Sequence, residues 1–451
     1  MAGTCISPEE MTRYAIAVAA AVLMSVRPGA AQEALTLNEA IGASVASNAS
    51  LRAARAAGDE AAARVPEARA GLFPRLSFSE SWQRGDQPVF VFSSLLASRQ
   101  FAAANFAIDF LNHPNPTGFF HASAGAEQLL FDGGRSRARS TAAGLQRDLA
   151  QATSEQTAAD LAVEVTRTFG RVLTAQATHR AADAALTSAH EDQSRAERRR
   201  DAGTATDADV LSFAARAADL RRQVIQADAD AAIASAELNR LMGRPVDHLF
   251  IAVAPAPFAP GDLPALDALF AEADAHRPEV RQAALSSTLA GVERHSAHSA
   301  LYPRIAAQGA VDWSGTRFND RASAWIAGVE LRWTLSTSGS EFAQRKAAAA
   351  AVSRAAALED DTRAAVHVDV VAAVRTREAA RARQAVGSAA VEQARESERV
   401  IRDRFAAGVA GVTDVLRASS ALLDAEANQT SALVDVIVSD ALLDRALGRK
   451  P

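Results

Sequence analysis

Side chains capable of chemistry occur in this chain, but they do not form a recognisable set. His295 and His298 have the i, i+3 spacing that lets two imidazoles approach one metal ion from a helix. No group of carboxylates or cysteines nearby completes a ligand set, so a solvated helix face explains the pair better. Asp132 precedes two glycines, as in some ion-binding loops, but a turn that ends a strand and begins a helix with Asp132 as its N-cap accounts for this motif.

The motifs of the common enzyme classes are also missing from the sequence. It contains no G-x-S-x-G, P-loop, H-E-x-x-H or C-x-x-C pattern, and its nine histidines show no general-base arrangement. We therefore predict that the chain is not an enzyme and binds no metal or cofactor. A net charge of -5 with interspersed signs also argues against a nucleic-acid partner.

The composition favours long helices over a bulky globular core. Apolar residues make up 49% of the 451 residues while aromatic residues make up only 5%, and alanine accounts for most of the difference. Alanine has the highest helix propensity and permits close approach of helices.

The N-terminus has the layout of a secretory signal peptide, predicted over residues 1–31. Arg13 is followed by an apolar run from Ala15 to Val26 and by small residues up to Ala31. Translation is then expected to start at Met11. A membrane anchor is the alternative, but about 12 apolar residues are too few to span a bilayer. The single cysteine, Cys5, precedes the apolar run, so the chain cannot form an internal disulfide.

The chain contains two copies of one plan. The tip motif Gly203-x5-Asp209-Val210-Leu211 recurs as Gly408-x5-Asp414-Val415-Leu416, and Phe73-Pro74-Arg75-Leu76 recurs as Tyr302-Pro303-Arg304-Ile305. We predict a first repeat over residues 33–250, a linker at 251–264 and a second repeat over 265–451.

Each repeat is expected to run helix, strand, strand, long helix, turn, helix. The first helices are predicted at 37–70 and 266–300, and the next two of the first repeat at 135–200 and 206–242. Apolar pairs recur every seven residues, as in Val210-Leu211, Ala217-Ala218 and Val224-Ile225, which is coiled-coil spacing. Two short helices stacked end to end would match one long helix of about 100 Å.

The strand segments alternate between apolar and polar residues. In residues 304–314 and 325–333, apolar side chains alternate with charged or polar ones, and residues 76–83 follow the same pattern. All four tryptophans fall in these segments: Trp82, Trp313, Trp325 and Trp333. They are expected to form a lipid-facing girdle, with Glu127, Glu330 and Arg332 on the inner face as paired or selectivity residues.

Strands exposed to lipid must close into a barrel, because no water satisfies an open edge. Four strands cannot enclose a channel, whereas three chains would supply twelve. A soluble β-sandwich is the alternative, but four strands leave too many edges open. The apolar segment 86–118 between the first two strands is expected to be an outward-facing loop.

Together these features resemble the TolC-like outer-membrane efflux protein family over essentially the whole mature chain. The specific residues are Leu130-Phe131-Asp132-Gly133-Gly134-Arg135 at the strand-to-helix junction, the Phe73-Pro74 segment and the two tip motifs. The resemblance implies a mainly α fold with a small β part. In it, a trimeric 12-stranded barrel in the outer membrane of a Gram-negative bacterium continues into a periplasmic helical coiled-coil barrel.

The resemblance also implies partners and sites. The homotrimer would export small molecules delivered by an inner-membrane pump through a periplasmic adaptor. The adaptor would dock at the tip turns, around Gly203, Thr204, Gly408 and Val409. The pore constriction would involve Phe405, Asp414, Arg417 and Asp209.

Two departures from the family pattern affect these expectations. The second junction reads Leu335-Ser-Thr-Ser-Gly339 instead of the usual Phe-Asp-Gly-Gly form, and position 417 is arginine where some relatives carry a second aspartate. A ring of Arg417 would partly neutralise a ring of Asp414, so we expect weaker cation selectivity than in diacidic relatives. Two other functions remain open: an outer-membrane duct for type I protein secretion, and a periplasmic coiled-coil scaffold without a pore.

Overall fold

A computed structural model describes residues 33–255 and 263–450 of the chain. The predicted signal peptide, Met11 and Cys5 lie outside the described residues. The chain divides into two compact units. Of the described residues, one unit contains 33–51, 158–255, 263–268 and 370–450, and the other contains 52–157 and 269–369. Each unit is described on its own.

Helix lengths repeat between the two halves of the sequence. Helices α2 and α8 have 11 residues each, α3 and α9 have 22, α6 and α10 have 67, and α7 and α11 have 35. Their bounds are α2 Leu37–Ser47, α3 Ala49–Ala70, α6 Arg135–Asp201, α7 Asp207–Leu241, α8 Leu266–His276, α9 Pro278–Ser299, α10 Ser340–Ala406 and α11 Val412–Ala446. None of the described helices is long and apolar enough to cross a membrane.

The single helix predicted at 37–70 is wrong, because the helix is interrupted at Asn48. The Asn48 side chain accepts hydrogen bonds from the N–H groups of Ser50 and Leu51 at 2.9 and 3.2 Å, and so caps α3. Its amide donates to the Leu241 carbonyl at the end of α7, at 2.9 Å. The second copy is interrupted at the corresponding position, Arg277, between α8 and α9, where Pro278 begins α9 and no side chain caps it.

The first unit has a core built around the middle of α6. Phe169, Val165 and Leu238 are fully buried there, together with Leu51 and Met242. Two short strands pair in parallel beside it, β1 (Glu33–Leu35) and β4 (Phe250–Ala252). The predicted linker 251–264 is therefore wrong at its start, because Ile251 and Ala252 belong to a strand.

Helix α7 packs with heptad spacing, although the buried seam differs from the predicted one. Val210, Phe213, Ala217 and Leu220 are buried, which is the a/d pattern of a coiled coil. Leu211 and Ile225, the second members of two predicted pairs, are 69% and 65% exposed. Seven-residue spacing was predicted correctly, but the sequence did not distinguish the buried stripe from an exposed apolar stripe next to it.

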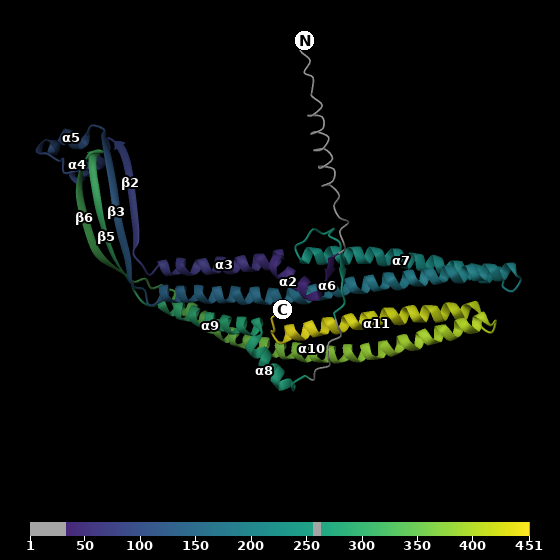
Figure 1. Cartoon of the computed structure of the whole chain (residues 1–451). Helices are drawn as coiled ribbons and strands as arrows, with labels where there is room; N and C mark the ends of the chain where they lie inside the picture. Colours follow the sequence, from purple (N-terminus) through teal and green to yellow (C-terminus); the bar gives the residue numbers. More distant parts are fainter. Residues whose placement is uncertain (1–32, 256–262, 451) are drawn as a thin grey trace, which may run out of the picture. The chain divides into compact units, whose positions relative to one another are not determined.

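The second unit contains a four-stranded antiparallel sheet in the order β2-β3-β5-β6 (Figure 1). Its strands are β2 Arg75–Gly85, β3 Thr117–Phe131, β5 Arg304–Arg317 and β6 Asp320–Arg332. The strands predicted at 76–83, 304–314 and 325–333 are present, and so is a fourth, predicted at about 120–130 from a weaker alternation. Each extends beyond its predicted bounds at one end or both. Within the described residues, β2 pairs only with β3 and β6 only with β5, so each outer strand has one unpaired edge.

The segment expected to be a loop at 86–118 is partly helical. It contains α4 (Pro88–Ala97), a 3-10 turn η1 (Ala103–Phe106) and α5 (Ile108–Asn112). Figure 1 shows α4 and α5 at one end of the sheet and the helices α3, α6 and α9 at the other end. Pro88 at the first helical position explains where α4 begins.

The position of Asn48 generates a stability prediction. In Asn48→Ala the α3 cap is lost and the buried Leu241 carbonyl loses its donor, so unfolding should become easier by about 1–3 kcal/mol. The midpoint of thermal unfolding, followed by circular dichroism at 222 nm, should fall. Asn38→Ala, an exposed position in α2, is the matched control and should leave the midpoint nearly unchanged. An equal midpoint for both variants would contradict the assigned role of Asn48.

Candidate functional site: a two-faced sheet and two helical tips

The pairing register gives the sheet one apolar face and one polar face. Directly paired residues point to the same side, and successive residues alternate. Trp82 pairs with Phe120, and Trp313 pairs with Ala122 of the same strand. Val311, two residues from Trp313, pairs with Trp325. The register therefore brings Trp82, Trp313 and Trp325 to one face, and Trp333 follows β6 in the same alternation.

Large apolar side chains on this face are open to the surroundings. Trp325 is 79% exposed, and several others are more than half exposed, namely Leu76, Phe78, Trp82, Val329, Leu331 and Trp333. A contiguous apolar surface of this kind is unusual on a water-exposed monomer and is typical of a surface that meets a partner or lipid.

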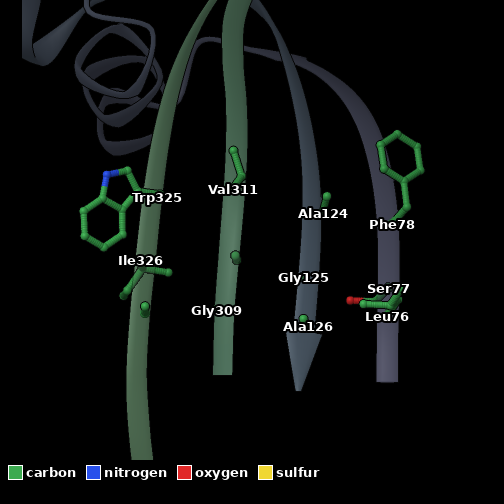
Figure 2. A pocket seen from close by; sticks show the side chains of 12 residues that line it. Leu76, Ser77, Phe78, Ala124, Gly125, Ala126, Gly309, Val311, Trp325 and Ile326 are labelled. Carbon is green, nitrogen blue, oxygen red and sulfur yellow. The ribbon is translucent and has the colours of Figure 1, made fainter. Parts of the chain in front are cut away.

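A shallow hollow of about 800 Å³ lies on the sheet, lined mainly by side chains of the apolar face (Figure 2). Small residues line its floor, among them Ala124, Ala126 and Gly309 on the two central strands. Phe78 and Trp325 stand on the two outer strands on either side of it. The hollow thus combines a narrow apolar floor with aromatic walls, which suits an acyl chain better than a polar ligand.

The opposite face carries charged residues that are paired with each other. Glu127 accepts a hydrogen bond from Arg304 at 2.7 Å, and Glu330 accepts one from Arg332 at 2.6 Å. The three predicted inner-face residues therefore lie on the polar face. Because these pairs are exposed, each contributes little to stability. Their presence makes this face suitable for contact with water rather than with lipid.

Helix α4 packs against the outer end of the polar face. Phe90 meets Phe119 edge to face with ring centroids 6.2 Å apart, and Phe119 stacks on His121. Gln100 hydrogen-bonds Thr316 at 2.8 Å and Asp320 at 3.2 Å, which ties the segment to β5 and β6. The apolar character of this segment is visible in the sequence, but its position on the polar face was not predicted.

The first junction between sheet and helix is closed by a capping residue. The Asp132 carboxylate accepts hydrogen bonds from the N–H of Gly134 at 3.1 Å and of Ser136 at 2.8 Å. Gly133 has φ +69, and a Cβ atom there would lie only 3.0 Å from Ser299 and Tyr302, so the position favours glycine on both grounds. The Asp132 side chain thus caps the start of α6, as predicted, although Asp132 stands two residues before the N-cap position at Gly134. Across the described residues, no group of His, Cys, Asp and Glu is arranged to hold a metal ion.

Both tips turn at a glycine. The next helix begins with a full capping box in the first tip, and with only the carboxylate half of one in the second, because Gly411 has no side chain. Gly203 and Gly408 have φ of 69 and 76, the left-handed region that favours glycine. Asp209 accepts a hydrogen bond from the N–H of Thr206 at 2.9 Å, and Asp414 accepts one from Gly411 at 3.2 Å. Both aspartates therefore have a structural role as the third residue of their helices.

The two tip residues expected next to Asp414 differ in how they are held. Phe405 packs against buried Phe213, and the guanidinium of Arg199 lies 5.0 Å from its ring centre. Its ring is thus part of the tip core. Arg417 is 76% exposed at its side chain and lies 3.8 Å from the Asp414 carboxylate. Of the two side chains, that of Arg417 is the one open to the surroundings.

Sequence reasoning missed a charged contact that joins the two tips. Arg402 of α10 lies 3.2 Å from the carboxylate of Asp192 on α6, and donates to the Ser188 hydroxyl at 2.8 Å. Burial raises the pKa of the Asp192 carboxyl above its usual range, while Arg402 and Arg195 oppose the shift. These residues belong to different repeats, and no local pattern in the sequence indicates that they meet.

A family model described as outer membrane efflux protein matches residues 40–244 and 269–449. The matched residues cover both repeats and include the sheet and both tips. The chain belongs to the outer membrane efflux protein family. This family consists of channels rather than enzymes. The protein is therefore an outer-membrane protein of a Gram-negative bacterium that extends into the periplasm.

Solved structures of outer-membrane channels share the fold of this efflux-family chain. The outer-membrane channel OprN is 22% identical, with a TM-score of 0.75 over 91% of this chain and 89% of that chain. The VceC outer membrane protein of Vibrio cholerae is 19% identical, with a TM-score of 0.74 over 92% and 96%. The CmeC outer membrane channel of Campylobacter jejuni is 15% identical, with a TM-score of 0.79 over 91% and 85%. No curated protein sequence matches the chain.

Proposed function

We propose that three copies of this chain form a passive duct that exports small molecules as the outer-membrane component of a tripartite efflux system. The observation that carries the proposal is the two-faced sheet with unpaired outer edges. Its apolar face suits lipid, and its polar face, with the ion pairs of Glu127 and Glu330, suits a water-filled bore.

The open edges support assembly from several chains. In hydrocarbon, an unpaired backbone N–H or C=O costs several kcal/mol, so β2 and β6 need partner strands. The natural partner of β6 is β2 of another copy. Three copies of four strands would give the twelve-stranded cylinder expected from the family resemblance.

The helices support the same assembly. Leu211 and Ile225 form an exposed apolar stripe at heptad spacing beside the buried seam of α7. A stripe of this kind stabilises a coiled coil when a second helix covers it. A helix of a neighbouring copy is the partner that a closed ring of helices would supply.

The position of α4 favours small molecules over proteins as the cargo. This helix packs on the polar face near the outer end of the sheet, held by Phe90 and Gln100. In a closed barrel the polar face lines the bore, so three such segments would narrow its outer mouth. The narrowing favours efflux over type I protein secretion.

The tips are the proposed contact with the other components. We assign adaptor docking to the turns at Gly203, Thr204, Gly408 and Val409, and the constriction to Asp414 and Arg417, with Asp209 nearby. An inner-membrane pump would deliver the cargo through the adaptor. Phe405 stabilises this arrangement from the tip core.

Oligomeric state and conductance test the proposal together. Purified protein in detergent should migrate as a trimer that dissociates on heating, measured by heat-modifiable gel mobility and by light scattering after size exclusion. It should also conduct ions in planar bilayers. Protein that stays monomeric and does not conduct would refute the proposal.

Removal of the outer segment should widen the mouth. Replacing residues 88–112 with a short Gly-Ser linker should raise single-channel conductance severalfold, because the segment no longer covers the polar face. Val89→Ser, at a side chain 81% exposed, keeps the segment in place and should conduct like the wild type. An unchanged conductance after the replacement would show that α4 does not narrow the bore.

Charge reversal at position 417 should change ion selectivity. In Arg417→Asp the constriction would change from mixed charge to entirely acidic, so the reversal potential in a KCl gradient should shift toward cation selectivity. Arg221→Asp makes the same charge change at an exposed position of α7 away from the turn and should shift it much less. No rise in cation selectivity for Arg417→Asp would remove residue 417 from the constriction.

A further inference from the structure

A groove of about 610 Å³ lies between α9 and α10, close to where the strands meet the helices. Its lining includes Arg294, His295 and His298 from α9, and Phe342, Arg345 and Lys346 from α10. None of the lining residues is acidic. The groove therefore combines three fixed cations with two imidazoles and an aromatic ring.

The three cations have no ion-pair partner among the described residues. Arg294, Arg345 and Lys346 make no salt bridge there, in contrast to arginines further along α10 such as Arg363 and Arg399. The nearest acidic residue on α10, Glu341, instead accepts a hydrogen bond from the N–H of Ser336 at 3.1 Å. The groove thus carries positive charge that the fold does not neutralise.

Ring contacts link the groove to the apolar face. Phe131 pairs with Ile305 on that face and packs edge to face with Tyr302 at 6.3 Å. Tyr302 in turn stacks on His298, a residue that lines the groove, with ring centroids 5.6 Å apart. The groove is therefore connected through Tyr302 to the surface assigned to lipid.

Exposed aromatic residues border the groove at the strand ends. Phe342 is 62% exposed and Tyr302 50%. Trp333 is 60% exposed and donates to the Leu301 carbonyl at 3.2 Å. Aromatic residues mark the level of the lipid headgroups in membrane proteins, and basic residues just beyond them attract anionic lipid. In the proposed duct, this level is the periplasmic boundary of the membrane.

We infer that this groove binds the phosphate group of an anionic phospholipid in the inner leaflet of the outer membrane. The phosphate would lie between Arg294, Arg345 and Lys346, since arginine and lysine are the side chains best suited to phosphate. Phe342 and Tyr302 would contact the glycerol region and the start of the acyl chains. The inference rests on the proposed function, because it requires the apolar face to be in lipid.

The test compares how two phospholipids change the thermal stability of the purified full-length protein in an uncharged detergent. Phosphatidylglycerol should raise the midpoint of thermal unfolding more than phosphatidylcholine does, because a ligand that binds only the folded state stabilises it. A triple variant, Arg294→Gln, Arg345→Gln and Lys346→Gln, should lose about 100-fold in apparent affinity, since each basic side chain near an anionic surface strengthens binding about fivefold.

Arg354→Gln is the matched control. Position 354 is nine residues after position 345, about two and a half turns, so it lies on the opposite face of α10. This variant should keep the wild-type rise in the unfolding midpoint with phosphatidylglycerol. Lys346→Gln alone should show a smaller rise than the wild type.

The inference is overturned if the triple variant and Arg354→Gln respond alike. It is also overturned if inorganic phosphate reproduces the shift, which would indicate a site for soluble anions.

Oligomeric state and conductance of the same samples separate this inference from the proposed function. A trimer that conducts but shows no difference between the two lipids leaves the duct intact and refutes the lipid site. Protein that neither trimerises nor conducts refutes the duct, and with it the membrane location on which the groove argument depends.

Discussion

The structure depends on one constraint, the need of β2 and β6 for hydrogen-bonding partners at their outer edges. In water such edges can bind solvent, but in hydrocarbon they cannot. The apolar face makes lipid the fitting environment for this sheet, and in the proposed duct the missing partners come from other copies of the chain. The arrangement of the long helices follows from the same need for partner strands. Because α6 and α10 begin within a few residues of β3 and β6, closing the strands into a ring would also arrange the long helices in a ring.

Much of the secondary structure could be predicted because its causes are local. The 67 residues of α6 were placed to within one residue by alanine content and by the absence of proline. The strands followed from their alternation. The helix breaks at Asn48 and Arg277 also have local causes, which the prediction did not use: an asparagine cap and Pro278 at the first position of α9. Only the distant contacts made at these breaks could not be predicted. Asn48 is held by the Leu241 carbonyl, and Arg277 by the carboxylate of Asp369 at 3.0 Å.

The candidate site was predictable in its positions but less so in its contacts. The tip glycines followed from the repeated motif, and the charged pattern of the strands placed Glu127 and Arg332 on one face. The contacts of the other side chains depend on how the two repeats pack together. Phe405 is held in a core that brings together residues from both tips, and the pairing of Asp192 with Arg402 joins segments about 200 residues apart. Such contacts exist only once both repeats have folded.

The matching lengths of the two repeats have an evolutionary consequence. Helices α6 and α10 have equal lengths, and so do α7 and α11. An insertion in one helix alone would displace its turn relative to the turn of the other repeat. It would also shift the buried heptad positions of that helix. A lineage that needs a longer or shorter reach across its periplasm must therefore change four helices together, in whole heptads. Duplicated segments of this kind are expected to vary in sequence much more freely than in length.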